Sequence, residues 1–121
     1  MTLKECYAAL GGDYDDAVRR LCSEKLVLKF VLRFIDDDSY SLLIHSLDEK
    51  NVEEAFRAAH TIKGVCQNLA FTSLEVSSSL MTEALRAGDM DGALGLRDEL
   101  INDYEKTISA ISALKNSEGT K

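Results

Sequence analysis

The sequence contains no proline and no tryptophan, and it has only seven glycines and three cysteines among its 121 residues. A chain without proline suits long helices joined by short turns better than a many-turned β-sandwich. No apolar run approaches the roughly 18 residues that a membrane span needs. Lys4 and Glu5 lie where a signal peptide would begin its apolar stretch, so we expect a cytoplasmic protein.

Basic residues are also scarce. Fourteen lysines and arginines face 21 aspartates and glutamates, which gives a net charge of −7. A protein that grips a nucleic-acid backbone or an anionic membrane needs a basic face, so we expect neither as a partner. The hydrophobic content of 45% is nevertheless enough to form the core of one domain.

The three cysteines, Cys6, Cys22 and Cys66, are too widely spaced for a zinc or redox pair. We expect three reduced thiols, of which most are packed in the interior. An odd number of cysteines without a repeating spacing does not indicate a disulfide framework.

No recognisable catalytic or metal motif is present. The acidic stretches 36–38 and 89–92 lack the glycine and glutamate of a calcium loop. Neither histidine has a glutamate three residues before it, which excludes the di-iron pattern of helical bundles. Phosphate-binding loops and nucleophile elbows are absent as well. We therefore expect no cofactor, no metal and no autonomous enzymatic turnover.

Apolar residues recur at helical spacing through four long stretches, which predict helices over about 24–48, 52–69, 73–87 and 90–115 after short N-terminal helices. Asp36, Asp37 and Asp38 interrupt the first stretch, which is either two helices or one; we expect one. Short connections place neighbouring helices antiparallel. The expected fold is all-α, an up-down antiparallel four-helix bundle in a single domain over 1–115, with a disordered tail over 116–121.

The two histidines have opposite surroundings. His45 precedes acidic residues one helical turn away, including Asp48, and is interpreted as an ordinary surface histidine. His60 instead has Arg57 three residues before it and Lys63 three residues after it. These cations would stabilise a negative group placed on the His60 imidazole.

A helical wheel places His60 roughly 110–120° from the centre of the apolar stripe, so its side chain should project from the bundle surface. Gly64 and Gln67 share this outer face. A glycine within a helix costs about 1 kcal/mol relative to alanine, which indicates a need for close approach at Gly64. An exposed imidazole is largely neutral at cytosolic pH and is then a nucleophile at nitrogen.

The segment 58–71, Ala-Ala-His-Thr-Ile-Lys-Gly-Val-Cys-Gln-Asn-Leu-Ala-Phe, followed by Leu74, resembles the histidine-containing phosphotransfer (HPt) domains of phosphorelays. Their signature is His-x-x-Lys-Gly within one helix, and the similarity extends from about Leu26 to Leu114. The resemblance implies a four-helix bundle that works with response-regulator receiver domains and a hybrid sensor histidine kinase. Magnesium would belong to the receiver.

The resemblance also implies roles for individual residues. His60 would accept a phosphoryl group from a receiver phospho-aspartate and pass it to another receiver. Lys63 would balance the charge of the phosphohistidine. Arg57, Gly64 and Gln67 would lie on the docking surface for the partner.

Two positions depart from the family pattern. Thr82 occupies the place where some members orient the histidine ring with a longer Glu or Gln, and Ala70 stands where glycine usually follows leucine. The alternative hypothesis is therefore an adaptor of the same fold that binds a response regulator or a partner helix without being phosphorylated. In either case we expect a monomer, because the bundle uses up the apolar stripes.

Overall fold

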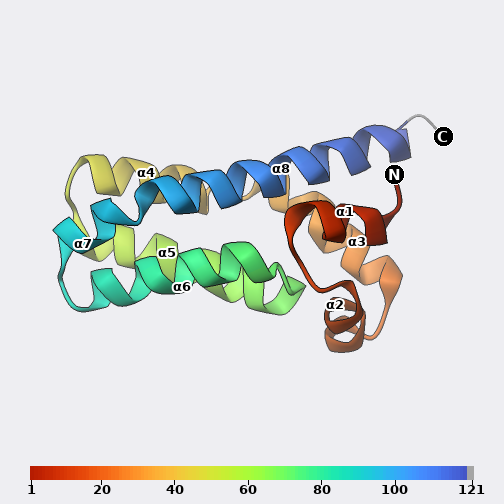
Figure 1. The fold of residues 1–121 in the computed structure, drawn as a ribbon, viewed down its shortest axis with the longest axis horizontal. Helices are drawn as coiled ribbons and strands as arrows, with labels where there is room; N and C mark the ends of the chain where they lie inside the picture. Colours follow the sequence, from red (N-terminus) through yellow and green to blue (C-terminus); the bar gives the residue numbers. More distant parts are fainter. Residues whose placement is uncertain (120–121) are drawn as a thin grey trace.

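The computed structural model describes the backbone of residues 1–119 and the side chains of residues 1–117. This part of the chain is all-α and contains no β-strand (Figure 1). In chain order its elements are α1 (Leu3–Leu10), α2 (Tyr14–Leu21), α3 (Glu24–Arg33), the 3₁₀ turn η1 (Phe34–Asp36), α4 (Ser39–Asp48), α5 (Val52–Leu69), α6 (Thr72–Arg86), α7 (Met90–Gly95) and α8 (Arg97–Gly119).

Short polar side chains begin most of these helices. Thr2 and Glu5 form a reciprocal capping box at α1, in which each side chain accepts a hydrogen bond from the other residue's backbone N–H. Asn51 caps α5 by accepting from the Glu54 N–H at 3.2 Å. These bonds satisfy backbone donors that have no partner within the helix.

The single helix expected over 24–48 is wrong, because the chain forms α3, η1 and α4 there. Asp37 takes an extended conformation with φ −74° and ψ 127°, which ends the helical path. Its Oδ1 accepts a hydrogen bond from the Ser39 N–H at 2.8 Å at the start of α4. A local side-chain acceptor of this kind competes with the helical backbone ladder, and here it prevails.

The helix expected over 90–115 is likewise divided, into α7 and α8, with Leu96 between them. At its other end α8 continues through residues 116–119, where we expected disorder. The Met1 amino group donates a hydrogen bond to Ser117 Oγ at 3.0 Å, which ties this end of α8 to the N-terminus. The remaining two residues of the expected tail, 120–121, lie outside the described residues.

Helices α4, α5, α6 and α8 lie side by side, each packed on the next, and α1 packs against the C-terminal half of α8 (Figure 1). One continuous set of buried apolar side chains joins them. Its largest fully buried members come from both halves of the chain: Tyr7, Leu10, Val27, Leu43, Leu47, Phe71, Leu74, Met81, Leu85, Leu100, Ile111 and Leu114.

The N-terminal segment holds the turn between α5 and α6. The Tyr7 hydroxyl donates to the Leu69 carbonyl at 2.7 Å, and the Asp13 N–H donates to the Ala70 carbonyl at 2.9 Å. Ala70 has φ +55°, in the left-handed region that favours glycine. These bonds satisfy carbonyls at the end of α5 and compensate for the strain at Ala70. The end of the helix that carries His60 is thereby fixed.

Candidate functional site

Helix α5 turns a small-residue face to the core and presents His60 on the opposite side. Its buried positions follow the helical repeat: Ala55, Ala58, Ala59, Ile62, Cys66 and Leu69. His60 is exposed, as the helical wheel predicts. The alanines let neighbouring helices pack closely against α5, which makes it a rigid support for the imidazole.

The surface beyond His60 is open. A Cβ atom built on Gly64 would meet nothing within 4 Å, so the protein's own packing does not require glycine there. Gln67 is exposed one turn further, and Lys63 is half-buried beside Gly64. Among the side chains of residues 1–117, Lys63 has no carboxylate partner. Its ammonium is therefore available to an incoming anion.

Arg57, unlike Lys63, has a carboxylate partner within the described residues. Its guanidinium lies 3.4 Å from the Glu54 carboxylate, and its side chain is 72% exposed. An exposed ion pair of this type is weak and exchanges readily with solvent or another anion. Arg57 thus lies near His60 with its charge already partly matched.

The structure does not bring Thr82 into the role suggested for it. Thr82 is completely buried, and its hydroxyl donates to the Ser78 carbonyl at 2.7 Å. The side chain is too short to reach out of the α6 interior toward an exposed ring. Within the described part of the chain, the His60 imidazole has no hydrogen-bond partner.

Phe56 is a neighbour of His60 that was not among the predicted site residues. The two rings are stacked with centroids 5.8 Å apart and planes inclined by 23°. The Arg86 guanidinium, from the end of α6, lies over the Phe56 ring at 5.0 Å from its centroid. The i−4 spacing of Phe56 and His60 was the available signal, since residues four apart share a helix face.

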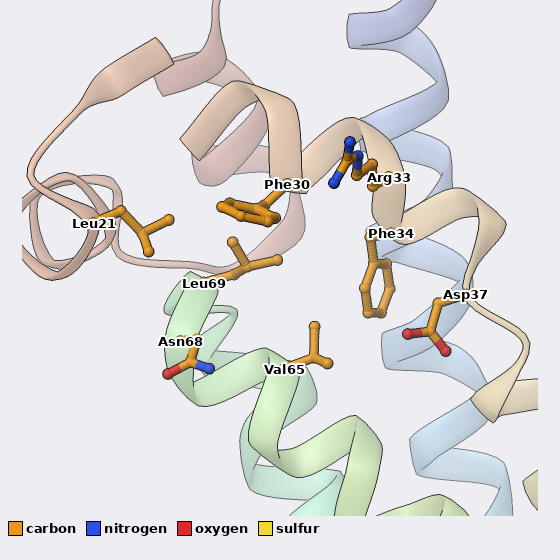
Figure 2. A pocket seen from close by; sticks show the side chains of 8 residues that line it. All are labelled: Leu21, Phe30, Arg33, Phe34, Asp37, Val65, Asn68 and Leu69. Atoms are coloured by element: carbon orange, nitrogen blue, oxygen red, sulfur yellow. The ribbon is translucent and has the colours of Figure 1, made fainter. Parts of the chain in front are cut away.

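A pocket of about 420 Å³ lies between the C-terminal part of α5 and the segment formed by α3 and η1 (Figure 2). Figure 2 shows Phe30, Phe34, Val65 and Leu69 around it, with Asp37 at one side. The lining is mainly apolar, and the pocket lies beyond His60 along α5.

The three cysteines differ in burial. Burial raises the pKa of the Cys66 thiol and raises that of Cys6 to about 11, so both stay protonated and unreactive at neutral pH. Cys22 is the exposed thiol of the three. The described residues contain no cluster of His, Cys, Asp and Glu suited to a metal ion. Over the same residues, every helix is too short or too polar to cross a bilayer.

The site thus combines an exposed histidine, a half-buried lysine that has no carboxylate partner among residues 1–117, and an open surface at Gly64. The family model of the Hpt domain matches residues 37–113, which is more than half of the chain, so the protein belongs to the Hpt domain family. Domains of this family transfer phosphoryl groups in phosphorelays and interact with the receiver domains and kinases of two-component systems. No curated protein and no solved structure matches the chain.

Proposed function

We propose that His60 accepts a phosphoryl group from the phospho-aspartate of one receiver domain and passes it to a second receiver. The observation that carries this proposal is the exposed His60 on α5, flanked by the open surface at Gly64 and by Lys63, which has no carboxylate partner among residues 1–117. An up-down four-helix bundle of α4, α5, α6 and α8 is the part of the fold that supports the site.

In the proposed transfer, the lone pair of His60 Nε2 attacks phosphorus in line with the aspartyl oxygen. The N–P bond forms as the P–O bond breaks, and the receiver aspartate leaves as a carboxylate. The imidazole keeps its proton on Nδ1, so the phosphohistidine first forms as an imidazolium and can then lose that proton to solvent. The reverse sequence loads the second receiver.

The transition state for phosphoryl transfer is loose and anionic, so positioning and charge balance provide most of the catalysis. Lys63 supplies positive charge next to His60. Arg57, Gly64 and Gln67 form the surface on which the receiver docks. The Mg²⁺ that phosphoryl transfer requires would be supplied by the acidic site of the receiver, so the proposal assigns no metal to this chain.

The test incubates the purified protein with a panel of phosphorylated receiver domains and maps the label by mass spectrometry under non-acidic conditions. We expect acid-labile phosphate on His60 and none in His60→Gln, with unchanged helicity by circular dichroism. His45→Gln is the matched control, because it removes the other exposed histidine and should be labelled like the wild type. Label that persists in His60→Gln would contradict the proposal.

The adaptor remains the second candidate, because the one side chain suggested to orient the His60 ring by hydrogen bonding, Thr82, is committed to the Ser78 carbonyl. The same panel separates the two. Receiver binding without label transfer, measured by isothermal titration calorimetry, would favour the adaptor. Sedimentation of the free protein and of the mixture would test the proposed monomer at the same time.

A further inference from the structure

We propose that Phe56 is a positioning residue for His60: its ring, itself held by Arg86, fixes the plane of the imidazole before the partner arrives. This inference rests on the proposed function of His60. In this proposal a stacked aromatic ring orients the imidazole, which a hydrogen-bonding side chain would otherwise do.

The first support is the geometry of the stack. A separation of 5.8 Å and an inclination of 23° are within the range of favourable offset aromatic pairs. The contact restricts the rotation of the imidazole about its Cβ–Cγ bond, because a ring turned out of this plane loses the stack. Both ring nitrogens lie on the edge of the imidazole, so they stay available while the ring face is held.

The second support is that Phe56 is itself held. It is half-buried and lines a shallow groove of about 450 Å³ together with Leu85 and Arg86. The Arg86 guanidinium lies 5.0 Å from its ring centroid, where a cation is attracted to the aromatic face. Arg86 in turn pairs with Glu83 at 3.4 Å. Residues of α6 therefore steady a ring on α5.

The third support is the lack of any other restraint. Within residues 1–117, no side chain donates a hydrogen bond to the His60 ring or accepts one from it. A freely rotating imidazole would have to be ordered during the transfer step, which lowers the rate. The Phe56 stack removes that requirement in advance.

The experiment compares Phe56→Leu with Phe56→Tyr, which keeps the aromatic ring. With a phosphorylated receiver as donor, we expect Phe56→Leu to slow transfer at saturating donor by about three- to tenfold, since one side-chain rotor must now be ordered during the reaction. The dissociation constant for the receiver should change by less than about twofold, and Phe56→Tyr should restore the wild-type rate.

Phosphoramidate serves as a second donor that needs no receiver docking. The same ranking of rates is expected with it, which locates the effect in the imidazole and not at the protein interface. The ¹³C relaxation of the His60 ring carbons Cδ2 and Cε1 measures how freely the imidazole rotates, which a purely structural role of Phe56 would not change. The ring should be more mobile in Phe56→Leu than in the wild type, and as ordered as the wild type in Phe56→Tyr.

Arg86→Gln should slow transfer in the same direction, and its effect should vanish in the Phe56→Leu background, because Arg86 acts through the ring. Arg19→Gln, a change at an exposed arginine on α2, is the control and should have no effect. Wild-type rates and an unchanged mobility of the His60 ring in Phe56→Leu would overturn the positioning role while leaving the phosphotransfer function intact. A wild-type protein that takes phosphate from neither donor would overturn both.

Discussion

At the scale of single residues, Gly64 is a position where neither helix stability nor packing explains the residue that is present. Glycine within a helix is less stable than alanine because it loses more backbone freedom on folding. The structure gives no packing reason for that cost, since the space around a Cβ at position 64 is empty within 4 Å. The sequence predicted close approach of a partner at Gly64, because this residue lies one turn after His60 on the outer face, and that role stays a prediction.

We expect Gly64→Ala to raise the free energy of unfolding by about 0.5–1 kcal/mol, because the helix gains propensity without a clash. The added methyl group should nevertheless slow phosphoryl transfer from a receiver several-fold, because it fills the surface that the partner approaches. Urea titration and transfer kinetics on the same sample measure the two effects.

Gly95→Ala is the matched control. Gly95 also has no atom within 4 Å of a built Cβ, but it lies at the end of α7, far along the chain from His60. It should gain stability without a change in transfer. Equal transfer rates for Gly64→Ala and the wild type would mean that the open surface has no role in docking.

The roles of Phe56 and Thr82 mark the limit of sequence reasoning at this scale. Phe56 lies four residues before His60, so the spacing places the two side chains next to each other on α5, but it does not show whether the Phe56 ring turns toward the core or toward the imidazole. Thr82 was placed by family resemblance, and its hydroxyl instead bonds within its own helix. The direction in which each of these side chains turns depends on the packing around it, and a linear pattern does not specify it.

At the scale of elements, helix starts were easier to predict than helix breaks. Caps such as Asn51 are local, so spacing identifies them. The break at Asp37 depends on competition between a side-chain acceptor and the backbone ladder, and the apolar periodicity continues across it. The end of α4 was equally hard to predict from the sequence, because no glycine occupies the left-handed position that ends this helix. Lys50 takes φ +54° there, and the Asn51 N–H donates to the Ser46 carbonyl at 2.9 Å.

This helix end supports a prediction about stability. Lys50→Gly should raise the free energy of unfolding by about 0.5–1 kcal/mol, because the left-handed conformation costs a residue with a Cβ more than it costs glycine. Lys50 is exposed, so little packing is lost. Thermal and urea unfolding measure the change. Lys50→Ala keeps the Cβ and is the control, for which we expect almost no gain. A gain of similar size in both variants would show that the side chain, and not the backbone conformation, is unfavourable.

At the scale of the whole molecule, the all-α class followed from periodicity and from the absence of proline, whereas the contribution of the N-terminal third did not. The family model begins at residue 37. Residues before it nevertheless supply fully buried side chains to the shared core, including Tyr7, Leu10 and Val27. Helix α1 lies along α8, and its following turn bonds to the end of α5 (Figure 1). Long-range contacts of this kind leave no periodic signature in the sequence.

A chain of residues 37–121 should therefore fail to fold cooperatively, although it contains the whole matched region. Each large apolar side chain contributes about 1.5–3 kcal/mol when fully buried, and a domain of this size has a total stability of only about 5–15 kcal/mol. Losing Tyr7, Leu10, Val27 and Val31 together removes most of that margin. Circular dichroism during heating measures the cooperativity.

Addition of a peptide of residues 1–36 should restore part of the cooperative transition, because the peptide can bind the fragment and supply the missing core side chains. A fragment that melts as sharply and at the same temperature as the full chain would show that the N-terminal helices contribute little to the stability of the bundle and that α5 keeps its position without them.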